Sequence, residues 1–328
     1  MRSVVQRSLS ALRRLRAPDP SSFQQPWPLA PGALSRLTKD VLVGKCSAAG
    51  AARISQFAAN GYAVFEGAIA PALIDALVAD VRSIGEHPGC FVTTDHKNGR
   101  SRRMSGPDFD SYESIFDTYV NFESARRVCF HPVIVDFLTR IFDAPPVAIQ
   151  QLLFQRSNQH ELHQDTSVVC VEEPLLMVAT WIALEDVVKG RGELTYFEGS
   201  HRIPHYRYSD GTKRFDPKVD DAERARRYLV EECSLAGCTK HDFIAKKGDV
   251  FVWAADLVHG SNPRTLPEHE TRMSLVTHYC PDTTQPYWLR FHPGHAARVK
   301  YEDATYMSSY YELPTRGGVV PPTVKLGN

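Results

Sequence analysis

The sequence lacks a long apolar run, a surplus of charge of either sign and closely spaced pairs of cysteines. No stretch approaches the roughly 18 apolar residues that a membrane-spanning helix needs. Lysine plus arginine equal aspartate plus glutamate at 38 each, without the basic surplus of proteins that bind nucleic acid or membrane surfaces. These absences predict a soluble protein whose partners include neither nucleic acid nor membrane.

The seven cysteines are odd in number and include no CxxC pair. Cys233 and Cys238 are close in sequence, but no second pair completes a zinc site, so we interpret all seven as reduced thiols of a cytoplasmic protein. The first 18 residues contain five arginines and no acid. This composition is also typical of a mitochondrial presequence, which leaves a mitochondrial location as the alternative.

Residues 18–35 contain five prolines and are predicted to form an extended linker. With 328 residues, 43% of them hydrophobic, the remainder is long enough to bury a large core. We therefore expect an N-terminal arm and linker over residues 1–50 and a single domain over residues 51–328. The sequence alone leaves the oligomeric state open.

The pattern of apolar residues predicts helices first and strands afterwards. Helical spacing covers residues 72–84 and 123–142, the second with a break at His131-Pro132. Residues 90–112 are predicted to form a hairpin or exposed loop with Asn98-Gly99 at its turn. A short strand is predicted at residues 62–65, before these helices. Short β-branched or aromatic runs follow the second helix at residues 147–154, 166–170, 176–184, 194–197, 249–253 and 273–279. This order predicts a mainly β domain with flanking helices, built as a sandwich or barrel.

The first chemical motif is His163-Gln164-Asp165. In extended backbone, residues two apart point to the same side, so His163 and Asp165 would project together and Gln164 away from them. An imidazole and a carboxylate side by side can occupy two positions on a metal. Two histidines and one carboxylate on one face form the arrangement of non-haem iron(II) oxygenases. A strand-end His–Asp contact is the structural alternative for this motif alone.

A second motif supplies the missing ligand. Gly248-Asp249 precedes an apolar run, and His259 emerges just beyond it. Arg272 and Ser274 then lie two apart at the start of another strand and would share a face. A guanidinium with a hydroxyl suits the distal carboxylate of a dicarboxylic co-substrate. His278 falls on the same face, where it could approach the cavity, but we favour its interpretation as a satisfied core histidine.

Together these motifs resemble the phytanoyl-CoA dioxygenase family of iron(II)/2-oxoglutarate oxygenases. The matching blocks are His163-Gln-Asp165, Trp181-Ile-Ala-Leu-Glu185-Asp186 with Gly192-Glu-Leu and Gly199-Ser200-His201, and Lys247-Gly248-Asp249 through His259-Gly260-Ser261 to Arg272-Met-Ser274. They span residues 147–280. The resemblance implies a double-stranded β-helix, or jelly roll, flanked by helices.

The resemblance also implies roles for individual residues. His163, Asp165 and His259 would hold Fe(II), and Arg272 with Ser274 would hold the far carboxylate of 2-oxoglutarate, with O2 as the oxidant. The residues that would line the co-substrate pocket are Trp181, Ser261 and Gln151. A basic residue before the jelly roll, Arg102 or Arg103, would contact substrate. Two departures stand out: Glu198 replaces a usual proline, and the wider spacing from His259 to Arg272 leaves Arg264 as a rival.

The implied activity is hydroxylation of an unactivated C–H bond in a small molecule, with release of succinate and CO2. Asp165 stands where related halogenases have a small residue, which favours hydroxylation over chlorination. The charged segments at residues 97–103 and 206–218 favour a polar substrate, with solvated surface loops as the alternative. The main alternative is a metal-binding jelly roll without oxygenase turnover, such as an isomerase or sensor. A zinc hydrolase is a third alternative, but this sequence has no HExxH-type motif that would supply its general base.

Overall fold

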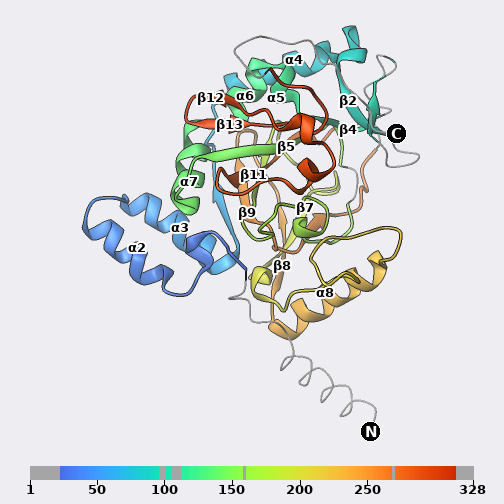
Figure 1. The fold of residues 1–328 in the computed structure, drawn as a ribbon. Coiled ribbons are helices and arrows are strands. Elements are labelled where there is room, and N and C mark those ends of the chain that lie inside the picture. Colours follow the sequence, from blue (N-terminus) through green and yellow to red (C-terminus); the bar gives the residue numbers. More distant parts are fainter. Residues whose placement is uncertain are drawn as a thin grey trace.

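The computed structural model describes residues 23–95, 101–104, 106, 112–157, 160–267 and 270–314. Two facing antiparallel sheets form its centre (Figure 1). The large sheet has the order β1 (Tyr62–Phe65), β9 (Val250–Ala254), β6 (Val178–Ala183), β11 (Ser274–Pro281), β5 (Pro146–Phe154), β4 (Tyr112–Phe116), β2 (Val92–Asp95) and β3 (Ser101–Arg103). The small sheet has the order β10 (His259–Ser261), β7 (Leu194–Glu198) and β8 (Thr239–Phe243). At one end of β5 the hairpin of β12 (Val299–Tyr301) and β13 (Ala304–Tyr306) extends the large sheet.

Alternation along the central strands separates two apolar layers. In β6, Val178 and Ile182 belong to the core under the helices, whereas Ala179 and Trp181 face the small sheet. Neighbouring β9 alternates in the same way, with Phe251 directed toward the small sheet. All residues of both strands are buried because both faces of the large sheet are covered. The space between the two sheets is therefore shaped by side chains from every second position.

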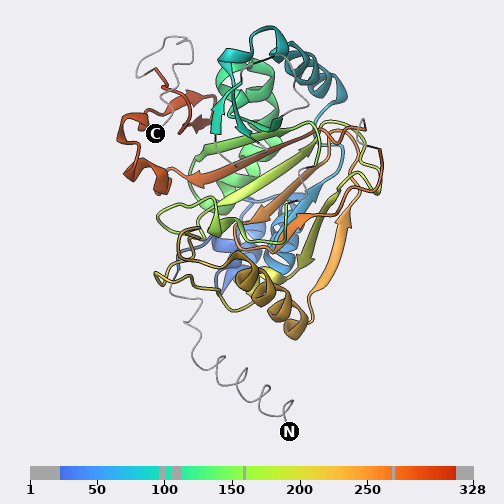
Figure 2. The same ribbon diagram turned by 90° about the vertical axis from the view of Figure 1, so that its right-hand side faces the viewer.

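Helices cover the outer face of the large sheet. They are α3 (Ala48–Asn60), α4 (Pro71–Ser83), α5 (Thr118–Asn121), α6 (Glu123–Cys129) and α7 (Pro132–Phe142). The predicted break at His131 is confirmed, since His131 caps α7 and Pro132 occupies its first turn. On the opposite side α8 (Ala222–Ala236) packs beyond the small sheet, as the view turned by 90° shows (Figure 2). These layers confirm the predicted mainly β fold with flanking helices.

Folded structure begins earlier than residue 50, where the sequence predicted an arm and linker. A short 3-10 helix, Trp27–Leu29, and α2 (Ala33–Leu42) precede that boundary. Leu37 and Cys46 are buried in the same apolar core as the large sheet. Of the described prolines in this segment, Pro26 and Pro28 lie at the start of the 3-10 helix and Pro31 lies between the two helices, positions that proline tolerates.

Of two further sequence predictions, one is wrong and the other agrees with the structure. Residues 166–170 were predicted to form a strand, but Asp165–Ser167 is a 3-10 turn. The segment is short and β-branched, which cannot distinguish a strand from a buried turn. Antiparallel pairing of β2 with β3 fits the predicted hairpin, whereas Asn98 and Gly99 lie outside the described residues. Within the described ranges, no helix is long and apolar enough to cross a membrane.

Candidate metal centre and the cavity around it

The three predicted metal ligands come together between the two sheets. Nε2 of His163 and Nε2 of His259 each lie 3.5 Å from Oδ1 of Asp165. One ligand atom from each of the three lies within 4.8 Å of the others, the only such group among the described residues. The backbones of His163 and His259 pair in both directions, at 2.9 and 3.0 Å. This pairing holds His163 beside His259, the first residue of β10, and the side chain of Asp165 points to the same side as that of His163.

Hydrogen bonds orient each ligand. Nδ1 of His163 contacts the carbonyl oxygen of Glu161 at 2.8 Å, and Nδ1 of His259 contacts that of Leu257 at 2.9 Å. A carbonyl oxygen only accepts, so both Nδ1 atoms carry hydrogen and both Nε2 atoms keep a lone pair for a metal. The two imidazoles are thereby held in the tautomer that a metal requires.

The second oxygen of Asp165 is held from the large sheet. Trp253 Nε1 donates a hydrogen bond to Oδ2 at 2.8 Å, and Nε2 of His278 lies 3.5 Å from the same atom. Trp253 and His278 both pair with Ala179, which lies between them on β6. Paired residues share a face of the sheet, so the small Ala179 leaves a gap that the carboxylate occupies. Oδ1 thus remains directed toward the two histidines.

Electrostatics keep this carboxylate ionised and His259 neutral. Burial opposes the charge of Asp165, but His259, His278 and a hydrogen bond with His163 bring its pKa well below the ordinary value. Burial lowers the pKa of His259 to about 4. Burial also opposes protonation of His163, yet the contact with Asp165 raises its pKa. A buried anionic carboxylate beside neutral imidazole nitrogen is the donor set that a divalent cation neutralises.

A cavity of about 510 Å³ opens beside the three ligands. Its metal end includes Trp181, Ser261, Arg272 and His278. Another part is lined by polar and aromatic side chains of the large sheet and the C-terminal segment, which we call the far end, namely Thr94, Ser114, Phe116, Gln150 and Tyr310. The cavity is of the size that holds a small molecule.

Arg272 is a buried cation with spare hydrogen-bonding capacity inside this cavity. It is 4% exposed, and its Nε has no hydrogen-bond partner. Nη1 donates to Oγ of Ser274 at 3.2 Å, and the guanidinium carbon lies 5.6 Å from the ring centroid of Trp181. Burial, followed by repulsion from Arg264, lowers the pKa of Arg272 to about 10, so it stays charged at neutral pH. A buried guanidinium of this kind fits a carboxylate ligand.

The other predicted residues of the co-substrate pocket divide into three groups. Trp181 and Ser261 line the cavity. Ser274 is fully buried behind Arg272 and acts on the cavity through it. Arg264 is not among the lining residues, and its Nη2 donates to the carbonyl oxygen of Glu270 at 2.9 Å. The structure therefore favours Arg272 over Arg264.

Gln151 does not line the cavity, and this prediction is wrong. Its Oε1 accepts hydrogen bonds from Thr118 Oγ1 at 2.6 Å and from the backbone N–H of Tyr119 at 3.0 Å, on the helix side of β5. Its neighbour Gln150 lines the cavity instead. A shift of one residue along a strand moves a side chain to the opposite face.

Neither Arg102 nor Arg103 is among the residues that line the cavity. Arg102 pairs with Thr93, whereas the cavity-lining residue of β2 is the next one, Thr94. Arg103 donates a hydrogen bond to the carbonyl oxygen of Gly89 at 2.8 Å. Both side chains therefore lie outside the site that the metal ligands define.

Sequence reasoning missed Trp253 and misjudged His278. The interpretation of His278 as a core histidine is wrong, because it lines the cavity and its buried Nδ1 has no partner. The signal for both was strand alternation: Trp253 follows Phe251 by two residues, and His278 follows Val276 by two. The pattern of alternation could not predict which face of each strand is directed toward Asp165.

Comparison with known proteins identifies the lineage of this site. The sequence profile of the phytanoyl-CoA dioxygenase (PhyH) family matches residues 57–267, which is more than half of the chain. The chain belongs to the phytanoyl-CoA dioxygenase family. The match includes His163, Asp165 and His259 but ends before Arg272. No curated protein matches the chain in sequence.

Several solved structures share the fold of this family member. The epimerase SnoN in complex with Fe3+, alpha ketoglutarate and nogalamycin RO has a TM-score of 0.58 at 18% identity, covering 79% of this chain and 98% of that chain. The alpha ketoglutarate dependent carbocyclase SnoK from nogalamycin biosynthesis has a TM-score of 0.53 at 18% identity, covering 82% and 94%. EctD from S. alaskensis with 2-oxoglutarate and 5-hydroxyectoine has a TM-score of 0.53 at 16% identity, covering 70% and 75%. These similarities confirm the predicted jelly roll.

Proposed function

We propose that this chain is an iron(II)- and 2-oxoglutarate-dependent dioxygenase that hydroxylates an unactivated C–H bond of a small polar molecule. One observation carries the proposal: the His163, Asp165 and His259 set shares a cavity with the buried, incompletely paired Arg272. Arg272 would have no purpose in a site that holds only a metal. Membership of the family, the Fe3+ and alpha ketoglutarate in the SnoN complex, and the 2-oxoglutarate in the EctD complex support the same proposal.

The residues fit these cofactors. His163, Asp165 and His259 would hold iron(II) with three ligand atoms, and the cavity beside them would leave room for a bidentate co-substrate and dioxygen. Iron(II), when bound with 2-oxoglutarate and O2, supplies the oxidising power to break a C–H bond, with succinate and CO2 as by-products. Arg272 and Ser274 would hold the far carboxylate of 2-oxoglutarate. Trp253 and His278 keep the carboxylate of Asp165 in position.

The remaining volume favours a polar, uncharged substrate. Thr94 and Ser114 hydroxyls lie 3.2 Å apart at the far end, and Gln150 Nε2 donates to the Tyr310 hydroxyl at 3.4 Å. Phe116 stacks on Tyr310 with ring centroids 4.1 Å apart, which gives the same end an apolar wall. These groups can hydrogen-bond hydroxyls or amides of a ligand while its carbon skeleton packs on the rings.

The test is an anaerobic titration with Fe(II) and then 2-oxoglutarate, followed by the weak visible charge-transfer band of the ternary complex. We expect the band in the wild type and its loss in the double variant His163→Ala/Asp165→Ala. Arg272→Met should weaken 2-oxoglutarate binding about 100-fold, because a buried charge-assisted pair is lost, whereas Arg264→Met should bind it like the wild type. Admission of O2 should then yield succinate.

Two outcomes would contradict the proposal. Absence of the band in the wild type would remove 2-oxoglutarate from the reaction. A band without any succinate, even with candidate polar substrates, would instead favour a metal-binding jelly roll without oxygenase turnover, acting as an isomerase or sensor. An epimerase or carbocyclase of the SnoN or SnoK type would also depend on 2-oxoglutarate. Analysis of the substrate-derived product therefore distinguishes these reactions from hydroxylation.

A further inference from the structure

A second cavity of about 300 Å³ lies on the other side of the segment that carries His163 and Asp165. Its walls come from that segment, from the loop before α8 and from the first half of α8. Glu161, His163 and Val168 line both cavities. The walls of the second cavity are mostly apolar and aromatic, with Leu162, Tyr206, Tyr208, Phe215, Ala225 and Leu229 among them. Its size is at the lower end of small-molecule sites.

Lys213 supplies a buried cation to this cavity. It is 2% exposed and lines the cavity. Its Nζ donates to Oε1 of Gln164 at 3.3 Å and to Nδ1 of His205 at 3.1 Å. An ammonium has three N–H donors, so one remains after these two contacts. Among the described residues, no carboxylate forms an ion pair with Nζ, and Asp256 acts on it only at longer range.

The surroundings of Lys213 hold more donors than acceptors. Burial lowers the pKa of His205 to about 3, so its ring is neutral. Because Nδ1 accepts from Lys213, the ring hydrogen is on Nε2, and this buried atom has no partner. Burial also lowers the pKa of Lys213 to about 8, which leaves it mostly charged at neutral pH. A buried cation without a paired anion is costly unless a ligand supplies the charge.

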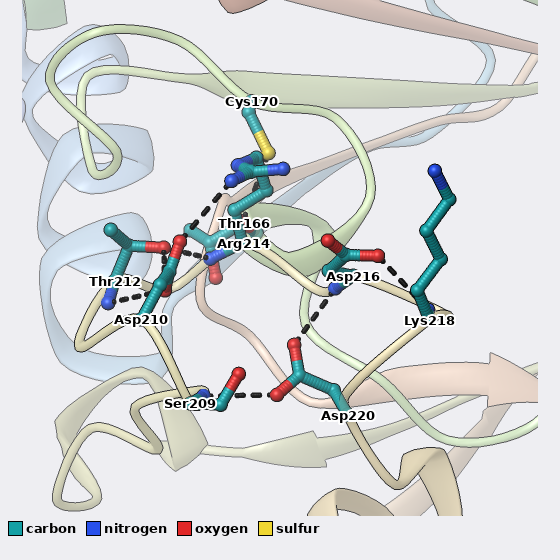
Figure 3. A network of polar contacts seen from close by, with 9 residues as sticks. All are labelled: Thr166, Cys170, Ser209, Asp210, Thr212, Arg214, Asp216, Lys218 and Asp220. Carbon is teal, nitrogen blue, oxygen red and sulfur yellow. Dashed lines mark hydrogen bonds and ion pairs between the residues drawn. The ribbon is translucent and has the colours of Figure 1, made fainter.

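The loop that presents Lys213 is braced from within (Figure 3). Asp210 accepts hydrogen bonds from the N–H and the hydroxyl of Thr212, at 2.8 and 2.7 Å, and pairs with Arg214 at 3.1 Å. Asp220 accepts from the N–H groups of Ser209 and Asp216, at 2.9 and 2.8 Å. These contacts on both sides of Lys213 hold its backbone in place without using its charge, so the site is formed before any ligand arrives.

We propose that the second cavity binds a small organic monocarboxylate with a flat apolar body, whose carboxylate receives the free N–H of Lys213. A single cation matches a single negative charge. Arg226 also lines the cavity, but Glu161 and Glu223 already pair with it. A phosphate dianion would need a second unengaged cation, so the carboxylate is the better fit. The rings of Tyr208 and Phe215 supply the apolar wall.

This inference rests on the second cavity and not on the proposed reaction. The test is isothermal titration calorimetry of the full-length protein with benzoate, and with benzamide as its uncharged counterpart. Benzoate should bind the wild type, and benzamide about tenfold more weakly or not at all. Lys213→Met should lose at least tenfold in benzoate affinity, whereas Lys218→Met, an exposed lysine of the same loop, should bind like the wild type.

Two more variants locate the binding. Ala222→Trp, at an exposed position on the rim, should block the cavity and weaken benzoate binding with Lys213 intact, even if Lys213→Met proves unstable. Arg272→Met identifies any benzoate that binds in the first cavity, because that binding would be lost with Arg272 and kept in Lys213→Met. No binding to the wild type, equal binding by Lys213→Met, or loss in Arg272→Met alone would each overturn the proposal.

Discussion

Asp165 uses its two oxygens for two purposes. Oδ1 lies 3.5 Å from Nε2 of both ligand histidines, and Oδ2 accepts from Trp253 Nε1 at 2.8 Å. A carboxylate that is held at one oxygen presents the other in a single direction. We therefore expect the indole N–H to contribute to metal affinity through Asp165, without being a ligand itself.

Replacing Trp253 with phenylalanine should lower the affinity for Fe(II) about tenfold, because it removes this hydrogen bond and keeps an aromatic ring in place. Anaerobic competition with a chromophoric chelator measures the change. Trp181→Phe is the matched control, since Trp181 lies in the same cavity but contacts Arg272. Equal metal affinity in the two variants would show that Trp253 has no part in holding Asp165.

At the scale of single residues, the sequence predicted the candidate metal ligands better than it predicted the residues around them. His163, Asp165 and His259 follow from residue type, and Gln164 points away from the metal side as alternation requires. Gln151 was assigned one position too far along β5. Strand β5 carries an irregularity opposite the step from His278 to Tyr279, and no residue pattern announces such a break. The face of a strand that is directed into the cavity depends on packing against residues that are distant in sequence.

Among the structural elements, the turn before β9 depends most on one residue. Gly248 has φ +89, and a Cβ there would meet the backbone carbonyl oxygen of Ile69. Its N–H donates to Ala183 O at 2.9 Å, and its own carbonyl oxygen accepts from Ile69 N at 3.1 Å. The turn thus ties the start of β9 to β6 and to the segment before α4. Because a strand that begins in register places Trp253 correctly, this turn also supports the metal site.

Gly248→Ala should lower the free energy of unfolding by roughly 3 kcal/mol, from left-handed strain and a clash that backbone cannot relieve. Gly237→Ala provides the control. Gly237 caps α8 with φ +71, but nothing lies within 4 Å of its Cβ position, so only the strain of about 1 kcal/mol applies. Urea denaturation of both variants measures the difference, and equal losses would refute the role of the contact with Ile69.

Element boundaries show what patterns can and cannot fix. The strand Tyr62–Phe65 and the division of α6 from α7 were predicted because glycine and proline mark them directly. Residues 166–170 were predicted as a strand from side-chain type alone. Their turn forms because Ser167 Oγ and three backbone N–H groups donate hydrogen bonds to the carbonyl oxygens of Gln164 and Asp165. A composition rich in threonine and valine does not reveal that preference.

For the molecule as a whole, stability should depend on a buried carboxyl group that is not one of the proposed metal ligands. Asp117 is fully buried, and burial raises its pKa to about 7, although Ser308 Oγ and the N–H of Gln151 donate to it at 2.5 and 2.6 Å. The unfolded chain releases this proton near pH 4. The folded state holds it to about pH 7, so its contribution to stability is present below pH 4 and is lost as the pH rises to 7.

Asp117→Asn keeps a residue that tolerates the positive φ of 49 at this position and cannot ionise. Relative to the wild type, it should therefore gain on the order of 2 kcal/mol of stability between pH 5 and pH 8. Chemical denaturation at the two pH values measures this gain. Asp136→Asn, which changes an exposed helical aspartate, should show none. A pH-independent difference between wild type and Asp117→Asn would show that Asp117 is already ionised at pH 5.

The reciprocal backbone bonds between His163 and His259 have a consequence for which ion the protein acquires. These bonds hold the two imidazoles in a fixed relation, so we expect the site to adjust little to the size of different divalent cations. Imidazole and carboxylate ligands bind the later first-row metals more tightly than iron(II), as the Irving–Williams order describes. We therefore expect iron occupancy to depend on supply: the divalent metal that is abundant and exchangeable where the chain folds should be the one that fills the site.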